Sequence, residues 1–116
     1  MYKFVILVEP LDNWDHFEER WPEFLHLVET LPGLSREATS RVDVFLYGTK
    51  PYVFMHELFF ASRAEAEKAL SSPEGQAAGA LLQQISNGKM SLFFADHRED
   101  DLVNILQHKQ VGGGVG

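Results

Sequence analysis

The segment from 51 to 61, PYVFMHELFFA, is apolar on both of the faces that it would have as a strand. Successive side chains of a strand point to opposite sides of a sheet, so even-numbered and odd-numbered residues separate into two faces. One face would carry Tyr52, Phe54, His56, Leu58 and Phe60, and the other Val53, Met55, Glu57 and Phe59. Both faces need burial, and a chain of 116 residues has too little material to cover both. We therefore expect something outside the subunit to cover one face.

Strand signals recur along the chain. The segments 2–9 and 89–97 also carry apolar residues on both sides, and each predicts a strand. Between 35 and 48, apolar and polar residues alternate over 41–46, which predicts a further strand in that part. The sequence GTKP at 48–51 is typical of a short turn, so this strand and the next should form an antiparallel hairpin.

Two helices are predicted between these strands. Large apolar residues recur at steps of three and four from 14 to 31, and the sequence LPGL ends that stripe. Pro22 lies inside the stripe, and we expect a kink there because proline removes a helical hydrogen bond. A capping box, SRAE, begins the second helix at Ser62, and SPE at 72–74 restarts it, with Ala77, Leu81 and Ile85 as its later stripe. Candidate N-caps for the first helix are Asp12, Asn13 and Asp15.

The resulting order, βαββαβ, predicts an α+β fold of the ferredoxin-like type. Its simplest form is a four-stranded antiparallel sheet with both helices on one face. The other face would expose a continuous apolar patch, which monomers rarely do, so we expect a homodimer in which two sheets pack face to face. Glu57 would then need a lysine or arginine partner. The residues predicted for this interface are Val53, Met55, Glu57, Phe59 and Phe93.

Composition restricts the partners and the location. The formal net charge of -7 makes attraction to nucleic acid or anionic lipid unfavourable, and the apolar runs are too short for a membrane span. The chain has no cysteine, which excludes disulfides and is compatible with the cytoplasm, where we expect the protein. We expect one domain over 1–98 and an extension over 99–116, with a short helix over 101–108 and a flexible Gly-rich end.

Three segments together resemble the EthD family of the dimeric α/β-barrel superfamily. They are PYVFMHELFFASRAEAEKALSSPEGQAAGAL, the LPGL turn and the closing strand SLFFADHRE, and the similarity covers nearly the whole chain up to Arg98. The run SPEGQA at 72–77 is the most specific piece. Family members often carry a histidine in the first helix, but this chain has Phe24 at that register and His26 two residues later.

The resemblance implies a dimeric barrel with a ligand pocket between the sheet and helices of each subunit. Similar folds include cofactor-free monooxygenases, isomerases, cyclases and haem enzymes, and the EthD-like branch is named for an accessory role in ether degradation. We expect the pocket to take a small hydrophobic molecule. The residues predicted for the pocket are Trp21, Phe24, His26, Phe54, Leu92 and Phe94.

His56 is the candidate catalytic residue. A neutral imidazole among aromatic rings can act as a general base, although a packed core histidine gives the same pattern. Asp96 is a weaker candidate that would orient the His56 ring, and its alternative is a surface aspartate at a strand end. Glu57 lies on the opposite strand face and cannot pair with His56. We expect no metal, because the other histidines lie at no metal-binding spacing: His16, His26, His97 and His108.

Two classes of function remain open at this point. One is a cofactor-independent enzyme, of the oxidoreductase, monooxygenase or isomerase type, acting on a small hydrophobic or aromatic compound. The other is a non-catalytic carrier or accessory protein of a catabolic pathway. Haem binding is a third option and would require His26 or His56 as the axial ligand. No phosphate-binding glycine motif or serine nucleophile motif is present, so we expect no bound cofactor.

Overall fold

The computed structural model describes residues 1–103. Most of the helix expected over 101–108, and all of the Gly-rich end, lie outside these residues. The βαββαβ order is confirmed, with the second helix divided in two as its restart signal predicts. The elements are β1 (Tyr2–Val8), α1 (Trp14–Glu29), β2 (Arg36–Arg41), β3 (Phe54–Phe60), α2 (Arg63–Ser71), α3 (Pro73–Ser86) and β4 (Met90–Asp96).

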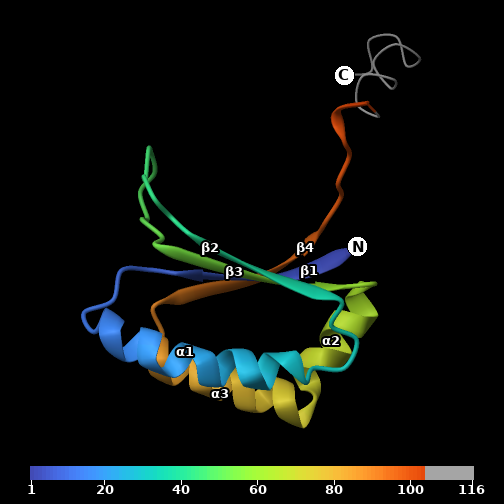
Figure 1. The fold of residues 1–116 in the computed structure, drawn as a ribbon, viewed down its shortest axis with the longest axis horizontal. Helices are drawn as coiled ribbons and strands as arrows, with labels where there is room; N and C mark the ends of the chain where they lie inside the picture. The colour runs from blue at the N-terminus through green and yellow to red at the C-terminus, as the bar shows by residue number, and fades with distance from the viewer. Residues whose placement is uncertain (104–116) are drawn as a thin grey trace.

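The sheet is antiparallel throughout, with strand order β2-β3-β1-β4. Helices α1, α2 and α3 cover one of its faces, and within residues 1–103 no helix covers the other face (Figure 1). The predicted ferredoxin-like α+β fold is therefore confirmed. In the central register His56 lies opposite Ile6, and Ile6 lies opposite Leu92, so these three side chains share the face that packs on the helices.

Short polar side chains begin and end the helices as their chemistry predicts. The side chain of Asn13 accepts a hydrogen bond from the backbone N–H of His16 at 3.2 Å, which selects Asn13 among the three candidate caps of α1. Helix α1 continues through Pro22 as one helix. Ser72 accepts from the N–H of Gly75 at 3.1 Å and so begins α3, and Asn87 ends α3 in the left-handed conformation at φ 53°.

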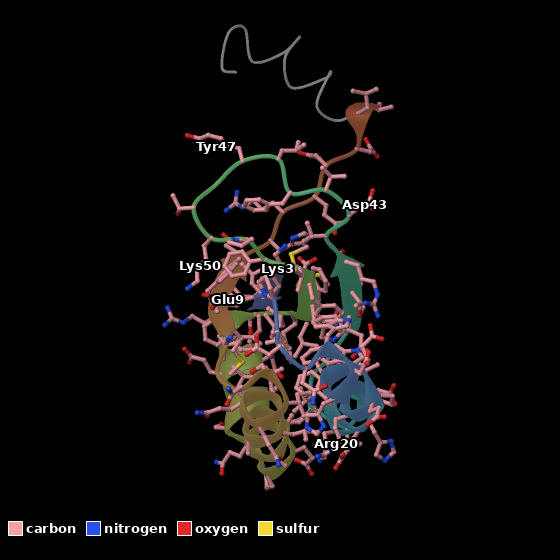
Figure 2. The ribbon with its side chains drawn as sticks, turned by 90° about the vertical axis from the view of Figure 1, so that its left-hand side faces the viewer. Lys3, Glu9, Arg20, Asp43, Tyr47 and Lys50 are labelled. Atoms are coloured by element: carbon pink, nitrogen blue, oxygen red, sulfur yellow. The ribbon has the colours of Figure 1, made fainter. Side chains whose placement is uncertain are left out.

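The second strand lies earlier in the chain than its alternating pattern predicts. The strand expected over 41–46 is wrong, because β2 is 36–41 and pairs with β3 from Arg36 opposite Phe59 to Arg41 opposite Phe54. One more backbone hydrogen bond, from Val42 N–H to Val53 C=O at 3.0 Å, closes the hairpin. The loop beyond it projects away from the helices (Figure 1), and Figure 2 places Tyr47 in this loop, far from Arg20 on α1.

An alternating pattern forms a strand only where a second strand is available to pair with it. Here β3 begins at Phe54, and Pro51 has no N–H to donate to a ladder. The loop residues Val44, Leu46 and Tyr47 are accordingly exposed.

The apolar stripe predicted for α3 is shifted by one residue at its start. Ala77 is exposed, and Ala78 is buried against the core.

The open face of the sheet is more polar than the sequence predicts. Phe59 is only 2 % exposed in the single subunit, because the Arg36 guanidinium lies 3.7 Å from its ring centroid and the His97 ring meets it edge to face. Glu57 has the cationic partner that the sequence requires, an ion pair with Lys3 at 2.5 Å. Phe93 remains 44 % exposed on this face. Part of the predicted apolar patch is therefore covered within the subunit.

Candidate ligand-binding site

His56 lies on β3 in the middle of the helix-facing side, and its side chain is fully buried. Its Nδ1 atom lies 2.8 Å from the hydroxyl oxygen of Thr39 on β2, so these two atoms share a hydrogen bond. Its Nε2 atom is buried with no hydrogen-bond partner among residues 1–103. Burial lowers the pKa of His56 to about 4, against the opposing influence of the Glu57 carboxylate. The imidazole is therefore neutral at physiological pH.

A ladder of stacked aromatic rings runs along the inner face of α1 and covers His56. Trp14, Phe17, Trp21 and Phe24 stack successively with ring centroids 4.8 to 5.2 Å apart, as their steps of three and four residues require. Trp21 meets the imidazole edge to face at 5.1 Å, and Phe24 does so at 6.2 Å. The polar atom of His56 is thereby separated from open space by two aromatic rings.

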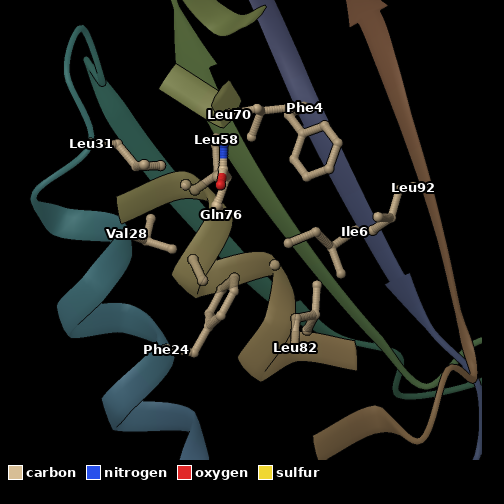
Figure 3. A pocket seen from close by; sticks show the side chains of 13 residues that line it. Phe4, Ile6, Phe24, Val28, Leu31, Leu58, Leu70, Gln76, Leu82 and Leu92 are labelled. Atoms are coloured by element: carbon tan, nitrogen blue, oxygen red, sulfur yellow. The ribbon is translucent and has the colours of Figure 1, made fainter. Parts of the chain in front are cut away.

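A cavity of about 280 Å³ lies between the sheet and helices α1 and α3. Its walls are apolar, and among residues 1–103 Gln76 is the one polar side chain that lines it (Figure 3). The cavity reaches the surface beside Leu92, which is 46 % exposed, and Gly79. Other wall residues are Phe4, Ile6, Phe24, Leu58 and Leu82.

The predicted pocket residues are distributed over different places. Phe24 and Leu92 line the cavity. Trp21 and Phe54 instead line a smaller hollow of about 130 Å³ on the outer side of the aromatic ladder, which also contains the ion pair of Arg41 with Glu18. Phe94 packs against Tyr2 and Phe4, each at 5.6 Å between ring centroids. The predicted residues therefore do not line one pocket.

His26 and Asp96 lie away from the site. The side chain of His26 is exposed on the outer side of α1, because the inward positions of that turn are those of Phe24 and Val28. On β1, Asp96 lies opposite Tyr2 and His56 lies opposite Ile6. Asp96 and His56 are therefore separated by two strand spacings and by roughly four residues along the strands, a distance on the order of 15 Å. The Asp96 carboxylate lies 3.5 Å from Arg98. The structure does not bring Asp96 to His56.

Sequence reasoning missed the wall that α3 contributes. Gly75, Ala78 and Gly79 all line the cavity, and the small-residue run GQAAGA was the available signal for a helix that leaves space beside it. A Cβ atom on Gly79 would meet nothing within 4 Å, so this position opens directly onto free volume. On Gly75 a Cβ would instead lie 2.3 Å from the carbonyl oxygen of Ala69. Gly75 thus permits close packing of α3 on the end of α2, and Gly79 leaves the cavity open.

Glu37 is a half-buried acidic residue near the site. It lies on β2 opposite Leu58, on the same side of the sheet as Thr39, and its Oε2 atom has no hydrogen-bond partner in the described part of the chain. Burial and the nearby carboxylate of Glu29 raise its pKa. No group of three or more metal-ligating side chains occurs within residues 1–103. Over the same residues no helix is both long and apolar enough to cross a membrane.

Comparison with known proteins identifies one relative and several similar structures. The chain is 32% identical over 98 residues, 83% of its length, to an uncharacterised 11.0 kDa protein from the thcB-thcC intergenic region of Rhodococcus erythropolis, of which the match covers 94%. No family model matches the chain. An EthD family protein from Bacillus halodurans has a TM-score of 0.77 at 20% identity, over 84% of this chain and 99% of that chain.

Two further solved structures share the fold. A dimeric ferredoxin-like protein of unknown function from Thermobifida fusca has a TM-score of 0.64 at 15% identity, over 83% of this chain and 90% of that chain. SnoaB, a cofactor-independent oxygenase from Streptomyces nogalater, has a TM-score of 0.61 at 15% identity, over 85% and 94% of the two chains. The predicted EthD-like, ferredoxin-like fold is confirmed by these similarities.

Proposed function

This chain belongs to the same family as the 11.0 kDa protein of Rhodococcus erythropolis, and from this premise we propose that it is a homodimer that binds a small apolar molecule under its helices. The observation that carries the proposal is the cavity of about 280 Å³ with its nearly uniform apolar wall. An apolar cavity of about 150 Å³ suffices for benzene, so this volume accommodates a substituted benzene ring or a short branched chain.

Binding without catalysis fits the geometry better than an enzyme does. Among the described residues, the cavity wall contains no acid, base or nucleophile, because Gln76 is the one polar side chain that lines it. The candidate base His56 is neutral, but Trp21 and Phe24 cover it. A carrier or accessory protein needs only the apolar wall, so we favour that role.

The cofactor-independent oxygenase or isomerase is the second candidate. It draws support from the buried neutral imidazole, and SnoaB shows that the fold is compatible with such chemistry in another protein. Consumption of oxygen or isomerisation of a bound phenol or lactone by the wild type, and its loss in His56→Gln, would favour this candidate. Haem has no support, because His26 points outward and His56 is covered, so neither faces the cavity as an axial ligand.

Dimer formation is supported by the helix-free face of the sheet, where Phe93 is 44 % exposed. The Thermobifida fusca protein with this fold is described as dimeric. A second copy placed on this face would cover Phe93 and leave one cavity under the helices of each subunit. The absence of cysteine is compatible with a cytoplasmic location, which we propose for this chain.

Blocking the cavity tests the proposal. Gly79 lines the cavity at its mouth, and Ala80 is the next residue of the same helix, exposed and not part of the wall. We expect Gly79→Trp to weaken binding of 4-ethyltoluene at least tenfold, measured by calorimetry, since the indole fills the entrance. Ala80→Trp adds the same bulk outside the cavity and should bind as the wild type does. Equal affinity of both variants for this probe would contradict the proposal.

A further inference from the structure

We propose that the ligand carries one hydroxyl or carbonyl group and that Nε2 of His56 forms the hydrogen bond that orients it, once the ring of Phe24 turns aside. This inference rests on the proposed function, because it specifies the chemistry of the molecule in the same cavity. It gives His56 a positioning role that holds whether or not a reaction follows. The inference is built on an unpartnered atom, on the rings that cover it and on the charge state of the imidazole.

The first observation is the incomplete hydrogen bonding of His56. Its Nδ1 atom shares a hydrogen bond with the Thr39 hydroxyl at 2.8 Å. Its Nε2 atom has no hydrogen-bond partner among residues 1–103, although the ring is fully buried. A buried polar atom without a partner costs about 1–3 kcal/mol, so such atoms are rare in stable cores. Leu58, two residues further on the same strand face, lines the cavity. Ile6, which lies opposite His56 on β1, also lines the cavity, so the His56 ring has two neighbours in the cavity wall.

The second observation is how little material separates Nε2 from free volume. Phe24 lines the larger cavity and Trp21 lines the smaller hollow, and the two rings stack at 4.8 Å while both contact the imidazole. Figure 3 shows Phe24 reaching from α1 to one end of the cavity. Displacement of the Phe24 ring away from the imidazole, without filling the cavity, would connect His56 to the larger cavity. Displacement of Trp21 would instead connect His56 to the smaller hollow.

The third observation restricts the ligand to neutral polar groups. The imidazole carries no charge, and the cavity wall supplies no cation, so a carboxylate or phosphate buried here would remain uncompensated. A neutral imidazole nitrogen either accepts from a hydroxyl or donates to a carbonyl, according to its tautomer. Phenols and aryl aldehydes or ketones therefore match the site, with the ring in the apolar cavity and the oxygen at Nε2.

Three probes of nearly equal shape test the inference: 4-ethylphenol, 4-ethylbenzaldehyde and 4-ethyltoluene. In a purely apolar cavity both oxygen-bearing probes should bind more weakly than 4-ethyltoluene, because they lose hydrogen bonds to water. In the wild type we expect at least one of them to bind about fivefold more tightly than 4-ethyltoluene, as one additional hydrogen bond allows. A carbonyl only accepts, so tighter binding of 4-ethylbenzaldehyde indicates a donating Nε2, whereas a preference for 4-ethylphenol without one for the aldehyde indicates an accepting Nε2.

The variants locate the hydrogen bond. His56→Leu should abolish the preference for the oxygen-bearing probe while 4-ethyltoluene still binds. His56→Gln replaces the imidazole with a carboxamide that can also donate or accept a hydrogen bond, and it should retain part of the preference. Gln76→Leu removes the polar side chain of the cavity wall, and loss of the preference in this variant would assign the hydrogen bond to Gln76 instead. Should His56→Leu fail to fold, ¹⁵N resonances of the wild-type imidazole replace it, with Nε2 expected to shift on adding the preferred probe and not with 4-ethyltoluene.

The outcomes separate this inference from the proposed function. Loss of the preference in Gln76→Leu, persistence in His56→Leu, or an unshifted Nε2 resonance would overturn the role of His56 while cavity binding stands. Binding of all three probes by the wild type without preference would do the same. If none of the probes binds the wild type, the proposed function itself is wrong and the inference falls with it.

Discussion

At the scale of single residues, His56 illustrates how burial decides chemistry. The residue type predicts a group that titrates near neutral pH, but its position beneath Trp21 and Phe24 removes the water that would stabilise the charged form. The Thr39 hydroxyl then engages one nitrogen and leaves the other free. The neutral state of this ring has a consequence for stability as well as for binding.

We predict that His56 makes the protein less stable as the pH falls from about 6.5 to about 4. In this range His56 of the unfolded chain becomes protonated, whereas His56 of the folded protein stays neutral because its pKa is about 4. The contribution of His56 to the free energy of unfolding is therefore complete above pH 6.5 and decreases below it. The loss at pH 4 is about 3 kcal/mol. Urea unfolding at pH 7 and pH 4.5 should show a larger decrease for the wild type than for His56→Leu.

The comparison with His56→Leu is necessary because other groups titrate in the same range. The raised pKa of Glu37 has the opposite effect, since it favours folding at low pH and the benefit decreases as the pH rises. Glu57 lies on the other face of β3 and remains in both proteins. Identical pH dependence in the wild type and His56→Leu would show that the imidazole titrates normally.

The Lys3 and Glu57 ion pair gives a second prediction at this scale. Both side chains are at most one-fifth exposed, so removing the lysine alone leaves a partly desolvated carboxylate without compensation. We expect Lys3→Met to lower the free energy of unfolding by about 1–3 kcal/mol. The double variant with Glu57→Leu should recover most of that loss in denaturant titration. A double variant as unstable as Lys3→Met would mean that packing, and not the unpaired charge, caused the loss.

At the scale of elements, the joint between α2 and α3 depends on Ser72 and Gly75. The Ser72 hydroxyl accepts from Gly75 N–H at 3.1 Å and donates to the carbonyl oxygen of Ala69 at 2.6 Å, so one side chain ends α2 and begins α3. The absence of a side chain on Gly75 lets α3 approach the last carbonyl groups of α2. The joint sets the direction of α3, and thereby the wall of the cavity.

Two glycines of α3 should respond oppositely to the same substitution. A Cβ at Gly75 would lie 2.3 Å from the Ala69 carbonyl oxygen and 2.6 Å from that of Leu70, and backbone atoms cannot move aside cheaply. We expect Gly75→Ala to destabilise the protein by about 1–3 kcal/mol. Gly79→Ala meets open space and should stabilise it by up to about 1 kcal/mol through helix propensity. Denaturation midpoints of the two variants measure both effects, and a stable Gly75→Ala protein would contradict this account of the joint.

At the scale of the whole molecule, one sheet serves two purposes. The helices cover one side of the sheet and leave the other side open (Figure 1). The helix-facing side forms the core and the cavity, and the open side combines the charged groups around Phe59 with the exposed Phe93. Exposed aromatic residues and arginine are enriched in protein interfaces, which have a polar rim. If two copies associate through this face, the charged side chains around Phe59 would restrict their relative orientation.

We predict that Phe93→Asp converts the proposed dimer to a monomer. A carboxylate at this position would be buried without a partner against the second copy, at a cost of several kcal/mol. Ala80→Asp, on the exposed side of α3, introduces the same charge away from the sheet and should remain dimeric. Sedimentation velocity at micromolar concentration distinguishes the two states, and a dimeric Phe93→Asp protein would place the interface elsewhere.

The comparison of prediction and structure separates local from distant causes. The caps at Ser62, Ser72 and Asn87 were predictable because each acts within one turn of its own chain. The position of β2 was not, because it depends on where β3 begins to offer hydrogen bonds. For His26 and Phe24, the helix period alone places residues two apart about 200° apart, on opposite sides of α1. The packing of α1 on the sheet decides which of these two sides faces inward.

The amino-acid sequence alone determined the order of the elements, the ferredoxin-like fold, the side of β3 on which His56 lies and the need of Glu57 for a cation, because periodicity and capping are local properties. Tertiary structure alone decided that α3 leaves a cavity, that Asp96 is remote from His56 and that two rings cover the imidazole. Those features depend on distances between segments far apart in the chain, which no local pattern records.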